Sequence, residues 1–382
     1  MKIGIITQYY KSLNFGGNLQ AFALQKKIEK LGCRCEQICY DRKYRNNLYC
    51  LLREVKHSNL KEFIPNIVKV IEYIFTCIIS FKDFFALFKR KSIFSFFSDS
   101  IPHSNNVYSS NDIENISDKY DIFIVGSDCV WYDQDNSEIY NLQFADSESK
   151  KISYAASLGC ASIPDGWCEK YLDAIKEFDG ISVREKSIAE ELQKLIPEKK
   201  IHITADPTLL FNADEWNSFL PSNSANKNYA LIYILSEDEN QCKAAEKWAH
   251  AMGLQALVFP HIHNIIHYWQ KDYGDIRDFS SGPLEFVSLI KNAEVIITDS
   301  FHASVFSTIF HRPFYALIRE TEKDFVGRVE NFLEDVGLSS QLTNVNELLH
   351  EKKLPEPDFS YADKIINQKR EESIKYLKEN LM

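Results

Sequence analysis

The segment from Val295 to Ser307 reads VIITDSFHASVFS, and it decides the fold class. It begins with a short run of β-branched apolar residues, which is typical of a strand buried on both faces. A polar turn follows, and small and apolar residues then continue at helical spacing to Phe310. A strand, a turn and a helix are half of a βαβ unit, and ligands of open α/β sheets bind where such a strand ends. His302, in the first helical turn, is expected to face this crevice; the alternative is a histidine that only bonds a neighbouring loop.

The alternation of strands and helices extends outward from this segment in two consecutive runs. One run covers residues 1–221 and the other covers 228–350, and the stretch between them is rich in Pro, Ser and Asn, as a linker would be. Two such runs predict an α/β protein with two Rossmann-like parallel-sheet lobes and a cleft between them. A helical insertion is expected in the first lobe at about 43–110, and the C-terminal helix at 361–382 is expected to join that lobe.

The composition restricts the partners and the compartment. The 382 residues carry a net charge of −10, which argues against a general nucleic-acid binder. Nine scattered cysteines, without a CxxC pair and without a signal peptide ahead of them, favour free thiols in a reducing cytoplasm. His261 and His263 lack a carboxylate or cysteine at a fitting distance, so we expect no metal site.

Residues 60–97 are unusually apolar and have a helical pattern. Four charged residues between Lys69 and Asp83 interrupt the run, so it should not span a bilayer. Packing of one or two helices onto the first lobe is the simpler interpretation. The alternative is an exposed apolar arm, flanked by the basic residues Lys89–Lys91, that contacts a membrane surface.

Two further segments of the first lobe have the residue types of a ligand site. Gly16 and Gly17 stand at the entrance to a predicted helix and let a backbone or a ligand approach closely. Asp128 and Trp131 follow the strand expected at 120–125, and a carboxylate beside an indole suits a sugar. A loop that is merely packed by the tryptophan is the alternative.

Arg184 stands at the end of the strand expected at 180–183. A planar guanidinium in that position suits a phosphate or a carboxylate. A surface ion pair with Glu185 or Glu190 is the competing interpretation.

Six segments together resemble the polysaccharide pyruvyl transferase family. They are NFGGNLQAFAL at 14–24, VGSDCVW at 125–131, ISVRE at 181–185, DPT at 206–208, GPLEF at 282–286 and TDSFH at 298–302. In this order they cover most of the chain except 43–110. The set is specific, although no single member is.

The resemblance implies a GT-B-like fold and the transfer of pyruvate from phosphoenolpyruvate to a sugar as a ketal, without a metal or another cofactor. Catalytic roles are expected for His302 and Asp128. The residues expected to bind the donor are Arg184, Ser300, Phe301 and Arg328. The residues expected to bind the acceptor are Asn14, Gly17, Asn18 and Trp131. Some family members carry an arginine where this chain has Ser300, and Arg328 is preferred over Arg319 and Lys323 as the source of the missing charge.

The acceptor is expected to be a glycan of a surface polysaccharide, either free or lipid-linked, so the protein would act in the cytoplasm or at the inner face of the membrane. Two other functions compete with this one. A nucleotide-sugar glycosyltransferase would use the same scaffold, since a fold does not fix the donor. A glycan-binding protein without catalysis would keep the cleft and not release phosphate.

Overall fold

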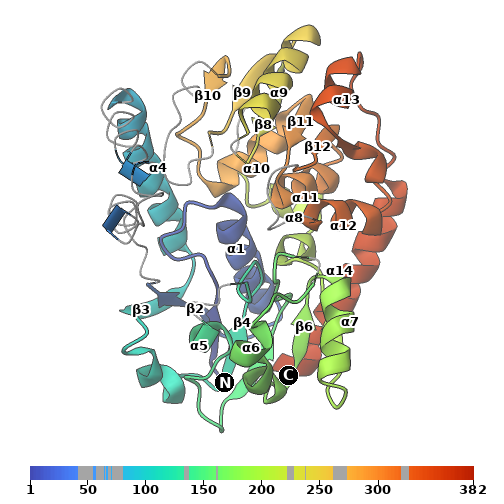
Figure 1. Cartoon of the computed structure of the whole chain (residues 1–382). Coiled ribbons are helices and arrows are strands. Elements are labelled where there is room, and N and C mark those ends of the chain that lie inside the picture. Colours follow the sequence, from blue (N-terminus) through green and yellow to red (C-terminus); the bar gives the residue numbers. More distant parts are fainter. Residues whose placement is uncertain are drawn as a thin grey trace.

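The computed structural model describes residues 1–41, 55–56, 64, 66–67, 70, 81–132, 137–160, 162–221, 228–236, 238–260, 273–319 and 327–382. It has two α/β lobes, one above the other in Figure 1, and a long C-terminal helix that runs along both. Parallel sheets lie at the centre of both lobes, which confirms the predicted fold class.

The first lobe is built on a five-stranded parallel sheet in the order β3-β2-β1-β4-β5. Its central strands pair in register, with Ile5 opposite Ile124, and both are buried because helices cover the two faces of such a sheet. The strands are β1 Ile3–Ile6, β2 Cys35–Tyr40, β3 His103–Tyr108, β4 Ile122–Val125 and β5 Lys150–Ser153, and a separate parallel pair consists of β6 Ile181–Val183 and β7 Ile201–Ile203. The helices are α1 Phe15–Lys30, α4 Phe81–Ser100, η1 Ile113–Lys119, α5 Ser137–Tyr140, α6 Trp167–Lys176, α7 Lys186–Leu195, η3 Pro207–Leu210 and α8 Ala213–Asn217.

The second lobe contains a six-stranded parallel sheet in the order β10-β9-β8-β11-β12-β13. The segment that decides the fold forms its fully buried strand β11, Val295–Thr298, and the helix α11, Phe301–Ile309, with Ser300 as the N-cap. The other strands are β8 Tyr229–Tyr233, β9 Gln255–Val258, β10 Ile276–Arg277, β12 Phe314–Leu317 and β13 Leu342–Thr343. The other helices are α9 Glu239–Ala251, α10 Pro283–Asn292, α12 Arg328–Asp335, η5 Ser339–Gln341 and α13 Val345–His350.

Helix α1 of the first lobe contacts the second lobe through aromatic side chains. Asn14 caps it by accepting a hydrogen bond from the backbone N–H of Gly17. Phe15, in its first turn, stacks on Phe286 of α10 with the ring centroids 4.5 Å apart, and it also packs on Phe94 of α4. The beginning of α1 is therefore held against the second lobe.

The C-terminal helix α14, Ser360–Leu381, packs on the first lobe. The hydroxyl of Tyr376 donates to the carbonyl of Ser153 at 2.8 Å, and Lys150 donates to the carbonyl of Asn380 at 2.7 Å. At its middle, α14 also contacts the second lobe, where Lys369 pairs with Asp335 at 2.7 Å. The last helix of the chain is thus held against the sheet of the first lobe.

The insertion differs from the expectation at its C-terminal end. Residues 103–108 form the edge strand β3, although the helical insertion was expected to continue to about 110. This strand is mostly polar and solvent-facing, so no apolar alternation marked it in the sequence. Helix α4 packs on the protein through Phe94 and Phe97, while most residues between 42 and 80 lie outside the described part. Within the described residues we find no helix with the length and hydropathy of a membrane span.

Candidate active site between the lobes

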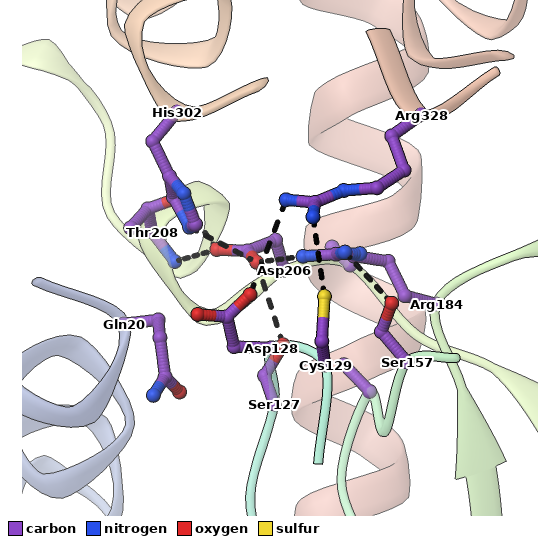
Figure 2. A network of polar contacts seen from close by, with 12 residues as sticks. Gln20, Ser127, Asp128, Cys129, Ser157, Arg184, Asp206, Thr208, His302 and Arg328 are labelled. Carbon is purple, nitrogen blue, oxygen red and sulfur yellow. Dashed lines mark hydrogen bonds and ion pairs between the residues drawn. The ribbon is translucent and has the colours of Figure 1, made fainter. Parts of the chain in front are cut away.

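Polar side chains from both lobes meet where the strands of the first lobe end (Figure 2). Asp128, Arg184 and Asp206 come from the loops after β4, β6 and β7, and His302 and Arg328 come from the first turns of α11 and α12. Parallel strands bring their carboxyl ends to one edge of a sheet, which explains why residues so far apart in the chain converge here.

Asp206 lies at the centre of the cluster and is only 1% exposed. Its Oδ2 atom accepts a hydrogen bond from Arg184 Nη1 at 2.9 Å and lies 3.5 Å from His302 Nε2. Its Oδ1 atom accepts from the backbone N–H of Thr208 at 3.0 Å and from the hydroxyl of that residue at 2.7 Å. Burial alone would raise the pKa of this carboxyl, but His302, Arg184 and Thr208 hold the pKa well below its usual range. Asp206 is therefore a carboxylate at neutral pH.

Arg184 is held by acceptors on every side. Nη1 donates to Asp206, Nη2 donates to Ser157 at 2.8 Å, and Nε donates to Glu185 at 3.3 Å. The guanidinium also lies over the ring of Phe301, 4.4 Å from the centroid, which is a cation–π contact between the lobes. Burial would lower the pKa of Arg184, yet the carboxylates of Glu185 and Asp206 raise it overall. The competing ion pair with Glu185 is therefore present, although it is buried and not at the surface, and the binding of a phosphate or carboxylate by Arg184 stays a prediction.

Arg328 faces two consecutive residues of the first lobe. Its Nη1 atom donates to Cys129 Sγ at 3.1 Å, and its Nη2 atom lies 4.0 Å from Asp128 Oδ1. Burial would raise the pKa of Asp128, but the charges of His302, Arg328 and Arg184 lower it overall. Burial raises the pKa of the Cys129 thiol to about 12, so this group is a neutral thiol. Asp128 itself has a positive φ of 69°, a left-handed backbone that carries its side chain toward the second lobe.

Gly16, in the first turn of α1, lies directly against His302 of the second lobe. A Cβ atom at Gly16 would lie 2.0 Å from Nδ1 of His302, a distance that no real contact allows. The glycine pair was expected to permit a close approach, and the group that approaches is the imidazole of His302. A Cβ atom at Gly17 would lie 3.5 Å from Asp128 Oδ2, so the same turn also borders the carboxylate.

The loop before α11 is held by hydrogen bonds of its own. Asp299 accepts from the backbone N–H groups of Leu235 at 2.6 Å and Ser236 at 2.8 Å, and Arg319 Nε lies 3.0 Å from its Oδ2 atom. Arg319 is thus paired with Asp299, whereas Arg328 lies in the cluster, as the sequence interpretation preferred. Lys323, the third candidate for this charge, lies outside the described residues.

The model of the polysaccharide pyruvyl transferase family matches residues 14–321. The chain belongs to this family. The match includes most of both lobes and four of the five residues of the cluster; Arg328 lies beyond its end. No curated protein matches the sequence.

Solved structures similar to this family member share its fold at low sequence identity. UGT89C1 of Arabidopsis thaliana, complexed with UDP-L-rhamnose, is 11% identical with a TM-score of 0.54, and the match covers 99% of this chain and 97% of that one. The UDP-GlcNAc 2-epimerase of Neisseria meningitidis, bound to UDP-GlcNAc, is 12% identical with a TM-score of 0.51 over the whole of both chains. The same enzyme from Methanocaldococcus jannaschii is 14% identical with a TM-score of 0.50 and coverages of 96% and 99%. These likenesses show the GT-B-type fold alone.

Two of the four residues expected to bind the acceptor have structural roles in this pyruvyl transferase family member. Asn14 caps α1. Asn18 is fully buried, donates to the carbonyls of Ser12 and Asn14, and accepts from the hydroxyl of Ser98 at 2.9 Å. Gly17 borders Asp128, and its role in binding the acceptor stays a prediction.

Trp131 was expected to lie beneath a sugar, and the structure shows that this expectation is wrong. Its side chain is 0% exposed, its Nε1 atom donates to the carbonyl of Tyr140 at 3.0 Å, and Trp167 packs against its ring. No ring face is left for a sugar, so the alternative interpretation of a loop packed by this tryptophan holds. The apolar core below the loop attracts the indole more strongly than the crevice above it.

Sequence reasoning missed the central residue, Asp206, and its neighbours Ser157 and Cys129. The Asp-Pro-Thr motif contributed to the family resemblance, but its aspartate was given no role. An acidic residue directly after a predicted strand was the available signal. Within the described residues, no group of three or more His, Cys, Asp or Glu side chains could hold a metal ion. His261 and His263, weighed as ligands in the sequence, lie outside that part of the chain.

Proposed function

We propose that this protein transfers pyruvate from phosphoenolpyruvate to a sugar of a surface polysaccharide or of its lipid-linked precursor, and forms a pyruvate ketal. The observation that carries the proposal is the convergence of two arginines and a histidine on two carboxylates between the lobes, in a chain of the pyruvyl transferase family.

Phosphoenolpyruvate carries about three negative charges, so it requires several cations and the positive end of a helix. Arg184, Arg328 and the beginning of α11 supply them. Arg328 is the arginine more readily drawn to the phosphate, because 4.0 Å separates it from Asp128, whereas Arg184 is 2.9 Å from Asp206. Phe301 lies beneath both guanidinium groups and keeps them at one side of the donor.

In the proposed reaction, His302 gives a proton to the methylene carbon of the donor, which leaves an oxocarbenium-like centre at C2. One hydroxyl of the sugar bonds to C2, and its proton passes to Asp128. The bond between C2 and the phosphate oxygen then breaks, and the phosphate leaves with the proton held by Asp128. A second hydroxyl bonds to C2 and gives its proton to His302, which completes the ketal and restores both residues. Inorganic phosphate is released, and no metal or other cofactor enters the proposed steps.

Mass spectrometry of candidate glycans incubated with phosphoenolpyruvate tests the proposal, with one added pyruvate ketal as the expected product. The His302→Ala protein should fold and form no ketal. A glycan modified equally fast by this variant would remove His302 from the mechanism.

The rival functions give different outcomes in the same set of measurements. A thermal shift with nucleotide sugars and none with phosphoenolpyruvate would indicate a glycosyltransferase on this fold. Binding of a glycan without any release of phosphate would indicate a binding protein. Cytoplasmic action, at the inner face of the membrane when the acceptor is lipid-linked, is part of the proposal.

A further inference from the structure

We propose that Asp206 is a positioning residue of the transfer reaction: its Oδ2 atom holds Arg184 of the first lobe and His302 of the second lobe at the same time. The inference rests on the proposed function, because it assigns the partner that places the donor-binding arginine and the proton donor relative to each other. Asp206 lies between these two side chains in Figure 2 and is only 1% exposed, so in this proposal it acts through them and does not touch the substrate.

The two carboxylate oxygens of Asp206 have different partners. Oδ1 accepts from the backbone N–H and the hydroxyl of Thr208, and these bonds cap the short helix η3 and fix the rotation of the carboxylate. Oδ2 is thereby directed at Arg184 Nη1, 2.9 Å away, and His302 Nε2, 3.5 Å away, with the Ser127 hydroxyl at 3.4 Å. Because Oδ1 is held by Thr208, the carboxylate cannot rotate freely, and Oδ2 has a defined position.

The backbone beside Asp206 is also held. The carbonyl of Ala205 accepts from the hydroxyl of Tyr154 at 3.0 Å, and the N–H of Ala205 donates to the hydroxyl of Ser373 in α14 at 2.9 Å. The position of Oδ2 is therefore set by the first lobe and α14 alone. His302 reaches it only when the second lobe is seated on the first.

The charge of Asp206 also acts between the lobes. His302, Arg184 and Thr208 lower the pKa of Asp206, so this carboxylate stays ionised beside the imidazole and the guanidinium. An uncharged amide at this position would leave Arg184 Nη1 without its buried acceptor at 2.9 Å and His302 Nε2 without the carboxylate oxygen at 3.5 Å.

The Asp206→Asn protein tests the inference. Asparagine keeps the size and the oxygen that caps η3, but its NH₂ group cannot accept from Arg184 or stabilise an imidazolium. We expect kcat to fall on the order of 10²-fold, the size of a loss that follows about 1 Å of misplacement. The KM for phosphoenolpyruvate should also rise, because Arg184 loses the acceptor that places it.

Asp363→Asn is the matched control, because it makes the same substitution in an exposed Asp–His pair outside the site, where Asp363 Oδ1 lies 2.9 Å from His311 Nε2. Its kcat and its KM should stay within a few-fold of the parent values. An Asp206→Asn protein with the kcat and KM of the parent, or an Asp363→Asn protein with the same losses as Asp206→Asn, would overturn the inference.

A second measurement does not depend on turnover. The NMR chemical shifts of the His302 imidazole, assigned by comparison with a His302→Gln protein, should change at fixed pH in Asp206→Asn and remain unchanged in Asp363→Asn. Unchanged chemical shifts in Asp206→Asn overturn the inference, whether or not the parent forms a ketal. Absence of ketal from the parent protein alone counts against the proposed function only.

Asp206→Glu replaces the asparagine variant if that variant does not fold. The longer side chain keeps the charge but displaces the carboxylate, so kcat should fall although the charge remains. A kcat equal to that of the parent would show that the position of Oδ2 does not matter.

Discussion

Gly16 lies against His302 because glycine carries no Cβ atom. The Gly16→Ala change would place a Cβ atom 2.0 Å from His302 Nδ1, so the imidazole or the beginning of α1 must shift. We expect turnover to fall on the order of 10²-fold as the ring is displaced, while the free energy of unfolding changes by about 1 kcal/mol, the usual size for a point change. Steady-state kinetics beside thermal melting measures both, and parent-like turnover would show that His302 need not sit against α1.

Arg184 depends on its shape as well as on its charge. In the Arg184→Lys protein a single ammonium replaces a planar fork that contacts three acceptors and lies over Phe301. We expect the Kd for phosphoenolpyruvate to rise about tenfold or more, which corresponds to about 1.4 kcal/mol or more. Isothermal titration calorimetry measures the change, and equal binding by the two proteins would remove Arg184 from the donor site.

The residues of the site were predictable to the extent that they follow strands. Asp128, Arg184 and His302 were named from the sequence because each stands at a strand end or in the first turn that follows one. Asp206 stands in an equivalent place but was given no role, because its importance comes from two partners on different lobes. Pairings across lobes depend on how the lobes are seated, and no local pattern in the chain records this.

At the scale of the elements, apolar patterns identified the central strands and failed at the edge. Strand β11 was predicted because a strand buried on both faces must be apolar throughout. Strand β3 was included in the helical insertion because an edge strand with polar residues lacks that pattern. The buried indole of Trp131 was misplaced for a related reason: an aromatic residue beside a carboxylate suits a crevice and a core equally well.

Helix α14 stabilises the first lobe through defined hydrogen bonds. Tyr376→Phe removes the hydroxyl that donates to the carbonyl of Ser153, and we expect a loss of about 1 kcal/mol in the free energy of unfolding. Tyr361→Phe is the matched control on the same helix, because that side chain is 54% exposed. Urea unfolding measures the free energy of unfolding of both proteins. Equal losses in the two would show that the hydrogen bond from Tyr376 to Ser153 does not stabilise the protein.

The segment predicted to contact a membrane is residues 60–97, and helix α4 is the main part of it that the structure describes. Phe94 and Phe97 pack on the protein, but Phe96 is 79% exposed on a helix that also presents Lys89 and Lys91 to solvent. If this surface contacts anionic lipid, the protein should float with anionic liposomes at low salt, and Phe96→Ser should reduce the floated fraction. Recovery of the parent protein in the soluble fraction would remove the membrane from the proposal.

At the scale of the whole molecule, the buried carboxylates between the lobes link stability to pH. Asp128 and Asp206 have pKa values lowered by folding, so their contribution is complete above the unfolded pKa of about 4 and is lost as pH falls through the folded pKa. We expect Asp206→Asn to lower the free energy of unfolding by about 1–3 kcal/mol at pH 7, because Arg184 loses a buried acceptor. The difference from the parent should shrink below about pH 4. Urea unfolding at several pH values measures it, and a constant difference would contradict the assignment.

The order of the elements in the chain also determines the order in which the two lobes can fold during synthesis. All six strands of the second lobe come before α14 in the chain, yet α14 supplies contacts to Ser153, Ala205 and Leu209 of the first lobe. On the ribosome, the second lobe can therefore close while the first still lacks its last helix. Until α14 emerges, its binding surface on the first lobe stays uncovered, and a nascent chain in that state is the species most prone to associate with others.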